Sequence, residues 1–547
     1  MLDRTSPLTR PRALALVALA WAAIYLPALG SLEIKGEEGR RILPAVTMLQ
    51  SGDWIVPRIG GEPYLSKPPL LNWLVAISFK ISGAQNEWTA RAPTVLAVLA
   101  LGLGLAWRGG AWLGPGGGLV AALLTLTSVG LMEKGRLAEL EGLYVACFGL
   151  ALVDWLASWR TGSNAWRLWL GPALPLGLGL LTKGPLCVVF FYAIVGAVLW
   201  RAGRLRELRH PAQFVGLALM LGIFAAWAMP YWQQAPRGKV GSAWSAQFTG
   251  RVQADEGFRF NNWIQNVPRG LFLFVPWAVF LPLLWQRETT AALAAQSPVD
   301  AAILRGARWA LAVCFLVVLL LPGGLPRYIL PLLVPAALLV AQALFAGDGL
   351  AVQWRKAWLL AAVVVISFGI SAFGWVGCSR LFGWRIHYHE LFMPALTVLP
   401  ILFFQFKLYR AERIHALSTL QLALLSTAAI AAFTWAYALA TPWLRGGENL
   451  RAAAARLNVA SAPDAIYALA PGYQPFLFYL RPAPRYIAAI DGLPAGASGF
   501  LLVKNDALPA ATTALAARGI PWHSVVTFDE KNRGRYFLLE FGRSNEG

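Results

Sequence analysis

Apolar segments long enough to cross a lipid bilayer recur along most of this chain, and no other feature restricts its fold so strongly. They begin at Ala13 and continue to Ala440, and each is about 15–25 residues long, the length of a membrane-spanning helix. Of the 547 residues, 57% are hydrophobic and only 14% are charged. A soluble protein of this size needs more surface charge, so we expect a polytopic α-helical membrane protein.

Basic residues predict how the chain is threaded through the membrane. Arg4, Arg10 and Arg12 precede the first apolar segment, which places the N-terminus in the cytoplasm by the positive-inside rule. That segment is not a cleaved signal peptide, because no A-x-A site follows it and apolar segments continue. The net charge of +20 is assigned to cytoplasmic loops rather than to nucleic-acid binding. These basic loops are 201–210, 287–308, 355–356 and 407–413.

The segment Leu70–Ser82 decides the orientation of everything that follows it. It is apolar but short, and it contains Asn72 and Lys80. As an interfacial helix it keeps the loop Arg108–Gly116 cytoplasmic, in agreement with the later basic loops, whereas a span would invert them. We therefore predict an interfacial helix, about thirteen transmembrane helices and an outer C-terminal tail. The predicted spans are 13–30, 92–107, 117–132, 142–159, 167–181, 185–200, 212–231, 270–285, 309–321, 327–345, 358–376, 390–405 and 416–440.

The sequence changes character after the last span. Residues 1–441 form the predicted membrane domain, including a first outer loop, 31–91, with interfacial helices. In residues 442–547, short strand patterns such as "GFLLVKND" and "RYFLLEF" alternate with helical patterns. This alternation predicts a small α/β domain with one modest core, on the periplasmic side.

Dense charge follows directly after the first apolar segment. The stretch "EIKGEEGRRILPAV" carries Glu37 and Glu38 beside Arg40 and Arg41, and Lys67 follows in the same outer loop. Pairing of the acids with the arginines on an interfacial helix would explain these charges without a function. Charge beside hydrocarbon is costly unless it is paired or used. Because cations converge on the outer side, a lipid-linked phosphate is the ligand that fits them.

Several motifs occur in an order that resembles one family. An acidic pair with a nearby arginine follows the first span, then "SGDWIVP", "YLSKPPL" and Arg91-Ala-Pro, and later "RLAELEGL", "LTKGP" and "LPRYILPLL". Over about residues 10–345 the chain resembles the aminoarabinose transferases of lipid A. More broadly, it is similar to the polyprenyl-phosphate-sugar glycosyltransferases that include the protein O-mannosyltransferases. The resemblance implies a C-type glycosyltransferase fold in the bacterial inner membrane, a periplasmic active site and an undecaprenyl-phosphate-linked sugar donor.

The resemblance also implies roles for residues of the first outer loop. Glu37 matches the catalytic acid of the family's "DE-x-R" motif, Glu38 the second acid and Arg40 the arginine. Lys67 matches the lysine expected to hold the lipid phosphate. Glu37 stands where aspartate is usual, and Ser66 stands where the lipid A enzymes have glutamate. These departures leave the sugar and the acceptor open more than the reaction class.

Further matches lie elsewhere in the chain. Arg58, Lys183 and Tyr328 match donor-phosphate contacts, and Glu141 falls where the family has an acidic residue in its second outer loop. We therefore predict catalytic roles for Glu37, Glu38 and Glu141, and donor-phosphate binding by Arg40, Arg58, Lys67, Lys183 and Tyr328.

The residue types suit inverting displacement at the anomeric carbon of the donor sugar. Cations would neutralise the departing phosphate, and Glu37 would act as general base on an acceptor hydroxyl. A lipid or glycan of the envelope, such as lipid A, or a protein is the expected acceptor. A divalent cation on Glu37, Glu38 and Glu141 stays an alternative that the nearby cations disfavour, so no cofactor and no metal site is predicted.

Two other function classes stay open. A transporter or flippase for a lipid-linked sugar is the main alternative, although no internal repeat is evident. The other is a non-catalytic component of polysaccharide assembly.

Overall fold

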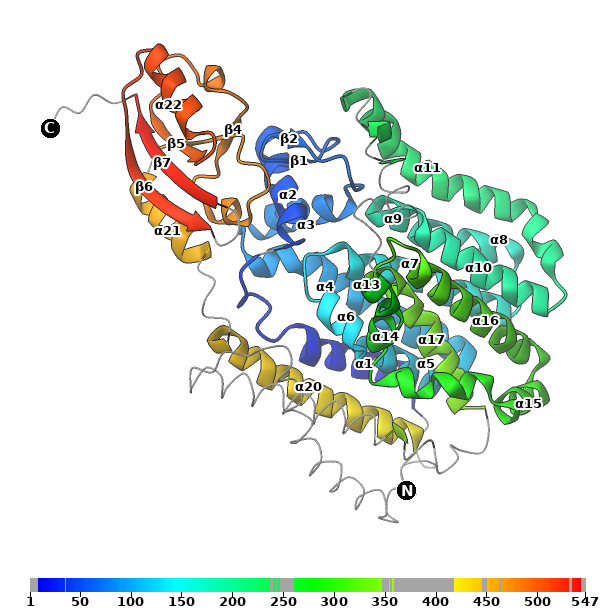
Figure 1. The fold of residues 1–547 in the computed structure, drawn as a ribbon. Helices are drawn as coiled ribbons and strands as arrows, with labels where there is room; N and C mark the ends of the chain where they lie inside the picture. Colours follow the sequence, from blue (N-terminus) through cyan, green and yellow to red (C-terminus); the bar gives the residue numbers. More distant parts are fainter. Residues whose placement is uncertain are drawn as a thin grey trace. The chain divides into compact units, whose positions relative to one another are not determined.

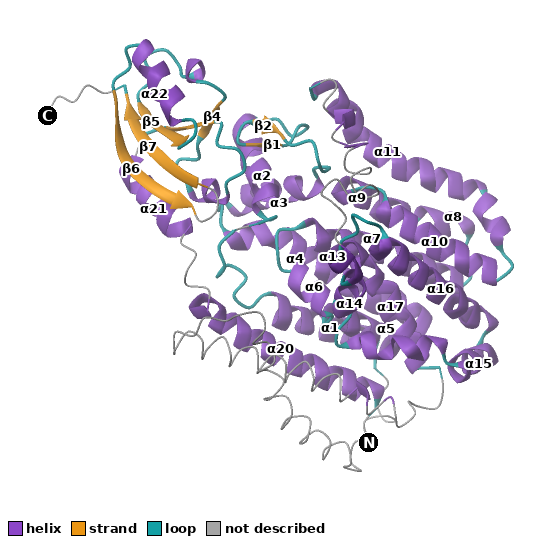
Figure 2. Ribbon diagram, in the orientation of Figure 1, coloured by secondary structure: helices purple, strands orange, loops and turns teal. Residues whose placement is uncertain are grey.

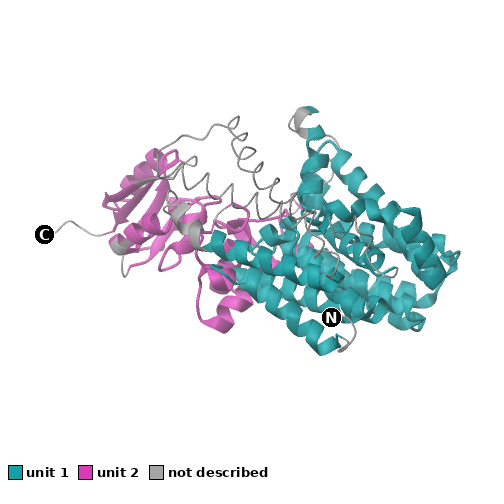
Figure 3. Cartoon of the chain, turned by 90° about the horizontal axis from the view of Figure 1, so that it is seen from below, with its two compact units in different colours: residues 1–29, 91–230, 241–444 teal, residues 30–90, 231–240, 445–547 magenta. Residues whose placement is uncertain are grey.

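The computed structural model describes residues 8–34, 36–236, 240–242, 244–245, 260–346, 354, 357–358, 418–444, 450–461, 464–530 and 534–542. The chain divides into two compact units (Figure 3). The helical unit comprises residues 1–29, 91–230 and 241–444, and the loop–tail unit comprises residues 30–90, 231–240 and 445–547. The spans predicted at 358–376 and 390–405 lie outside the described residues.

Helices make up the described part of the helical unit (Figures 1 and 2). The most enclosed are α7 (Leu140–Arg160) and the continuous segment of η4 (Pro326–Leu332) and α17 (Leu333–Leu344), which are buried on nearly all sides. Helices that are apolar all round occupy the interior of a bundle. The others are α1 (Arg10–Tyr25), α4 (Glu87–Gly104), η1 (Leu105–Gly109), α5 (Gly110–Leu126), α6 (Val129–Lys134), α8 (Ala165–Leu170), α9 (Ala173–Lys183), α10 (Leu186–Arg201), η2 (Leu205–Arg209), α11 (Pro211–Gln234), α13 (Phe260–Ile264), α14 (Asn266–Phe272), η3 (Trp277–Trp285), α15 (Arg287–Gln296), α16 (Pro298–Leu320) and α20 (Thr419–Leu444).

Among the described residues, six helices are long and apolar enough to cross a membrane, or seven if one bent pair counts as a span. The predicted number of about thirteen is therefore not confirmed. One long helical stretch, Glu87–Leu126, nevertheless contains a reversal. Gly114 has φ +76°, and a Cβ added to Gly118 would lie 2.5 Å from the backbone nitrogen of Gly110. The chain thus turns back within 108–116, where the sequence predicts a loop.

Prolines and helix-start signals explain where the predicted spans differ from the observed helices. The predicted span 270–285 is divided into α14 and η3, which are bent by 104°. Pro276, which directly precedes η3, accounts for the break, because proline lacks the N–H that an α-helix requires. In contrast, α16 begins at Pro298, inside the predicted cytoplasmic loop 287–308. The Ser297 side chain caps it by accepting from the Asp300 N–H, a start signal that hydropathy does not register.

The loop–tail unit contains a five-stranded sheet built by the C-terminal residues. Its strand order is β4-β3-β5-β7-β6, with β3 parallel to β4 and β5, and β7 antiparallel to β5 and β6. The predicted α/β character of the tail agrees with these elements, although the sequence reading missed β6. They are α21 (Leu450–Ser461), β3 (Ile466–Leu469), η7 (Pro475–Tyr479), β4 (Arg485–Ile487), η8 (Ile490–Gly492), β5 (Gly499–Lys504), α22 (Leu508–Ala517), β6 (Trp522–Glu530) and β7 (Gly534–Phe541).

The first outer loop supplies the rest of this unit. It folds into α2 (Gly39–Ser51), the two-residue strands β1 (Arg58–Ile59) and β2 (Glu62–Pro63), and α3 (Leu70–Ser82). The helix predicted over Leu70–Ser82 is therefore present. Its 13 residues are too short to cross a bilayer core of about 30 Å. Its place at the membrane interface stays a prediction.

Polar contacts fasten the C-terminal domain to the first outer loop. The Glu33 carboxylate accepts from the backbone N–H groups of Leu450 and Arg451, each at 3.0 Å, and so caps the start of α21. Arg451 Nε lies 2.6 Å from Glu87 Oε1, which also accepts from the Tyr479 hydroxyl at 2.8 Å. Burial raises the pKa of the Tyr479 hydroxyl, which therefore stays protonated as a donor. These segments form one structural body despite their separation in sequence.

Candidate active site

The acidic pair lies at the start of α2. Gly36 adopts φ +55°, a left-handed conformation that favours glycine, and Glu38 is the residue immediately before the helix. The Glu37 carboxylate accepts from Arg41 Nη2 at 3.1 Å and from Arg40 Nη1 at 3.4 Å. A carboxylate beside a helix N-terminus is stabilised by the helix dipole. The pairing that would explain the charges structurally is therefore present, and it centres on Glu37.

The two arginines have different environments. The Arg41 side chain is only 5% exposed and also donates to the Tyr64 hydroxyl at 2.9 Å, while its backbone carbonyl accepts from Asn72 Nδ2 at 2.7 Å. Arg41 thus connects α2 to the segment that leads into α3. The Arg40 side chain is 45% exposed. Arg40 is therefore the arginine of this pair that a soluble ligand can reach.

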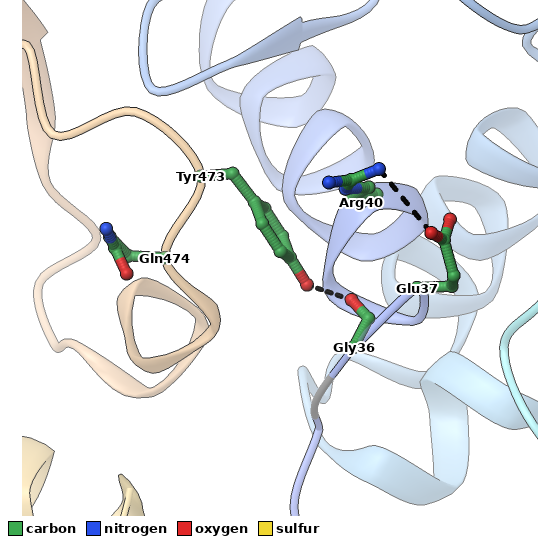
Figure 4. A pocket seen from close by; sticks show the side chains of 5 residues that line it. All are labelled: Gly36, Glu37, Arg40, Tyr473 and Gln474. Carbon is green, nitrogen blue, oxygen red and sulfur yellow. Dashed lines mark hydrogen bonds and ion pairs between the residues drawn. The ribbon is translucent and has the colours of Figure 1, made fainter. Parts of the chain in front are cut away.

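A pocket of about 410 Å³ lies beside Glu37 and Arg40 (Figure 4). Residues of the C-terminal domain form its other wall: the Tyr473 ring centroid lies 5.1 Å from the Arg40 guanidinium carbon, a cation–π contact. The Tyr473 hydroxyl donates to the backbone carbonyl of Gly36, the residue before Glu37. Gln474, which is 7% exposed, completes the lining. The charged stretch that contains Glu37 and Arg40 and the C-terminal domain therefore line the same pocket.

The remaining predicted residues of the first outer loop lie on segments joined to α2. Glu38 is 3% exposed. The Nε atom of Arg58, in β1, lies 3.7 Å from Asp53 Oδ2. Lys67 is half-buried and lies between Tyr64 and Asn72, the two side chains that contact Arg41. The segment 64–72, which contains "YLSKPPL", is thus bonded to Arg41 of α2 at both ends, and Lys67 lies within it.

A second charged cluster lies in the helical unit. Glu141, in the first turn of α7, accepts from Lys183 Nζ at 2.9 Å, and Arg327 Nε lies 3.9 Å from the same oxygen. Lys183 Nζ also lies 5.0 Å from the Tyr328 ring centroid. Glu141 and Lys183 are 7% and 10% exposed, so this ion pair is largely shielded from water. Two cations share one carboxylate, which leaves an excess of positive charge.

The structure therefore divides the predicted site residues into two groups. Glu37, Glu38, Arg40, Arg58 and Lys67 belong to the loop–tail unit, and Glu141, Lys183 and Tyr328 belong to the helical unit. Among the described residues, no cluster of three or more His, Cys, Asp or Glu side chains is arranged to hold a metal ion.

Sequence reasoning missed Tyr473 and Gln474. Their segment, "APGYQP", shows only a turn signal, with Ala470 at φ +39° and Gly472 at φ +63°. Asp154, in α7, has its Oδ1 atom 2.7 Å from both Arg108 Nε and Arg167 Nη2, so it connects neighbouring helices.

Known proteins resemble this chain in both sequence and fold. Residues 66–230 match the family described as dolichyl-phosphate-mannose-protein mannosyltransferase. The undecaprenyl phosphate-alpha-4-amino-4-deoxy-L-arabinose arabinosyl transferase of Pseudomonas savastanoi is 30% identical over 340 residues, 60% of this chain and 61% of that protein. The corresponding transferase of Erwinia tasmaniensis is 27% identical over 64% of this chain and 61% of its own length.

The likeness in fold extends over more of the chain than the likeness in sequence. The crystal structure of ArnT from Cupriavidus metallidurans bound to undecaprenyl phosphate superposes with a TM-score of 0.67 at 18% identity, over 98% of this chain and 99% of that one. The apo structure of the same protein gives a TM-score of 0.65. This chain has the aminoarabinose transferase fold.

The resemblance predicted from the motifs of the sequence is thereby confirmed for the aminoarabinose transferases. The likeness in fold to ArnT extends over 98% of the chain. The sequence match is shorter, and the chain aligns with about three fifths of the length of these curated relatives. The individual site residues are placed by their own geometry alone, and their roles are proposals.

Proposed function

We propose that this ArnT-like protein is an integral membrane glycosyltransferase. It takes a sugar from an undecaprenyl-phosphate-linked donor and transfers it to an acceptor of the cell envelope, a lipid, glycan or protein. The main support for this proposal is the similarity in fold, over nearly the whole chain, to a protein whose structure was solved with undecaprenyl phosphate bound. The relatives named as aminoarabinose transferases make an aminopentose the first donor sugar to test.

Glu37 is the proposed general base. Its carboxylate lies at the pocket, where an acceptor hydroxyl can approach from water, and Arg40 and Arg41 fix its orientation. The acceptor oxygen forms a bond to C1 of the sugar, and its proton passes to Glu37. The bond between C1 and the phosphate oxygen breaks, and undecaprenyl phosphate leaves. Direct displacement inverts the configuration at C1. We propose that Glu38 and Glu141 support this step.

Two groups of side chains are proposed to bind the donor phosphate. One is Lys67 with Arg58 and Arg40 in the loop–tail unit. The other is Lys183 with Tyr328 in the helical unit, where Arg327 adds positive charge beside Glu141. A departing phosphate gains from preorganised donors in both ground and transition states. Each group is tested separately by variants confined to it.

The proposed location is the bacterial inner membrane, with a cytoplasmic N-terminus and the loop–tail unit in the periplasm. Reporter fusions at Arg206 should then read cytoplasmic, and fusions within 464–530 should read periplasmic. A cytoplasmic reading for the C-terminal fusions would contradict the assignment of Leu70–Ser82 as an interfacial helix.

The proposed function is tested by transfer in detergent, where no sealed compartment exists. The purified protein is incubated with radiolabelled undecaprenyl-phosphate aminoarabinose and lipid A, and the products are examined by mass spectrometry. Release of undecaprenyl phosphate together with a glycosylated acceptor supports the proposal. A flippase would leave the bond between sugar and phosphate intact. If that donor fails, comparison of envelope glycans, lipids and proteins from cells with and without the gene identifies the sugar transferred.

A further inference from the structure

The turn between α9 and α10 follows directly after Lys183, one of the residues proposed to bind the donor phosphate. Helix α9 ends at Lys183 and α10 begins at Leu186. Between them Gly184 has φ +106°, a conformation that glycine adopts more readily than other residues. We infer that Tyr144 of α7 is a positioning residue that holds this turn, and with it Lys183, in place for the donor. The inference rests on the proposed donor role of Lys183 and adds the residue that sets its position.

The Tyr144 hydroxyl bonds to the chain on both sides of the turn. It donates to the Gly184 carbonyl at 3.0 Å and accepts from the Cys187 backbone N–H at 2.5 Å. Cys187 lies in the first turn of α10, where backbone N–H groups have no partner within the helix. One side-chain oxygen therefore connects the end of α9 to the start of α10. Tyr144 is only 2% exposed, so water cannot easily take the place of its hydroxyl.

The Tyr144 ring acts on the Lys183 ammonium group directly. Lys183 Nζ lies 5.7 Å from the centroid of the Tyr144 ring and 5.0 Å from that of Tyr328, both within the range of a cation–π contact. Glu141, whose carboxylate lies 2.9 Å from the same Nζ, is three residues before Tyr144 and so lies on the same face of α7. Tyr144 thus restrains Lys183 twice, at the backbone through its hydroxyl and at the ammonium group through its ring.

The helices around the turn are closely packed. Helix α7 packs against both α9 and α10 (Figure 1). A Cβ added to Gly179 would lie 2.8 Å from Cys187 Sγ, so α9 and α10 approach each other closely beside the turn. A lysine that is already held in place costs less free energy to order when the phosphate binds. Tyr144 should therefore strengthen donor binding through Lys183, without a contact of its own to the phosphate.

Donor binding in Tyr144→Phe is the first measurement. Tyr25→Phe is the matched control, because Tyr25 is also buried in the helical unit and its hydroxyl donates to the Leu126 carbonyl at 2.8 Å. Each variant keeps the ring and loses one hydroxyl, so both should lower the melting temperature by a similar small amount. Full-length protein in detergent is titrated with undecaprenyl phosphate. Tyr144→Phe should weaken binding about three- to tenfold, and Tyr25→Phe should leave it within about twofold.

The second measurement follows the position of Lys183 without the donor. Lysines are labelled by reductive methylation, and the rate at Lys183 is read from peptide mass spectrometry, with the exposed Lys80 as internal reference. Tyr144→Phe should increase the labelling rate of Lys183 about three- to tenfold, and Tyr25→Phe should not change it. Gly184→Ala strains the same turn without removing the hydroxyl and should give both changes seen in Tyr144→Phe.

The outcomes separate the inference from the proposed function. Unchanged labelling in a folded Tyr144→Phe protein, or an equal loss of donor affinity in Tyr25→Phe, would overturn the positioning role. Faster labelling with unchanged donor affinity would contradict the proposed donor role of Lys183 and leave the positioning role standing. In transfer assays Tyr144→Phe should raise the donor KM and leave the acceptor KM within about twofold, whereas equal increases in both would contradict the inference. If the wild-type protein binds undecaprenyl phosphate but transfers no sugar, the proposed function fails and the positioning of Lys183 does not.

Discussion

The two units carry their charged clusters in different ways. In the helical unit, Glu141 and Lys183 are almost completely buried, and each lies at the end of a long or tightly packed helix. In the loop–tail unit, Glu37 and Arg40 are 32% and 45% exposed and lie beside an open pocket. The loop–tail cluster depends on chain segments separated by more than 400 residues, such as Gly36 and Tyr473.

This difference in burial suggests two separate functions, anion binding and substrate exchange, for residues that the sequence analysis grouped into one charged site. A buried ion pair keeps its geometry because breaking it is expensive, which suits a fixed anchor for an anionic group. Exposed side chains such as Glu37 and Arg40 can exchange water for substrate at low cost. In both clusters two cations share one carboxylate, so the clusters differ in burial and not in the sign of their charge. We therefore expect variants of the pocket to change catalysis and variants of the helical cluster to change stability as well.

The largest effect is expected for Glu37→Gln. Glutamine keeps the size of the side chain but cannot accept the acceptor's proton, so transfer should fall about 10²–10⁴-fold. Donor binding should persist, because we propose that the cations and not Glu37 bind the phosphate. The measurement is single-turnover transfer beside equilibrium binding of the donor. Glu62→Gln, at an exposed glutamate of β2, is the matched control. Near-normal transfer by Glu37→Gln would leave its pairing with Arg40 and Arg41 as the explanation of the motif.

The next effect concerns the stability of the helical unit. Glu141→Ala leaves Lys183 buried without its carboxylate and should lower the free energy of unfolding by about 3–5 kcal/mol. Thermal melting in detergent measures the change. Glu133→Ala removes an acid that is 56% exposed and pairs with Lys134 at 3.2 Å, and should cost no more than about 1 kcal/mol. A Glu141→Ala protein that melts normally but transfers no sugar would instead assign Glu141 directly to catalysis.

A smaller effect is expected for Lys67→Ala in the loop–tail unit. Loss of one charge-assisted contact to a phosphate costs about 1.5–3 kcal/mol, which corresponds to donor binding about 10–150-fold weaker. The affinity is measured with undecaprenyl phosphate itself. Lys80→Ala, at an exposed lysine of α3, is the control and should leave affinity unchanged. Unchanged affinity in a folded Lys67→Ala protein would move the donor phosphate away from this loop.

Local signals in the sequence account for what could be predicted. The motif around Glu37, the helix at Leu70–Ser82 and the position of Lys183 at the end of a helix all follow from residues adjacent in the chain. Hydropathy also located the centres of α7 and α11, but it could not register the bend at Pro276 or the capped start of α16. Length and composition predict apolar segments, whereas breaks within them depend on individual prolines and caps.

Contacts between distant segments could not be predicted. Tyr473 shows no property in the sequence that would connect it with Gly36 or Arg40, because the contact depends on how the sheet of the tail packs against α2. The same holds for Arg451 and Glu87. One sequence without aligned relatives contains no record of such pairs. The separation of the predicted site residues into two clusters is therefore seen only in the structure.

The smallest predicted effect tests whether the loop–tail unit is held by these distant polar contacts. Glu33 accepts from the first two N–H groups of α21, at 3.0 Å each, and so acts as an N-cap supplied by another part of the chain. Replacing a helix cap by alanine costs about 0.5–2 kcal/mol. Glu33→Ala should therefore increase hydrogen exchange of the amides at the start of α21 by about 2–30-fold and leave α7 protected as before.

Glu62→Ala provides the matched control for this last variant, because Glu62 lies in the same outer loop and is exposed. It should leave the exchange of α21 unchanged, since surface substitutions away from such contacts usually change stability by less than about 0.5 kcal/mol. Faster exchange confined to α21 and the neighbouring η7 would show that the C-terminal domain can loosen from the first outer loop while the helical unit stays folded. Equal acceleration in α7 would mean that the two units unfold together, and the contrast between a rigid anchor and a separately held pocket would then be lost.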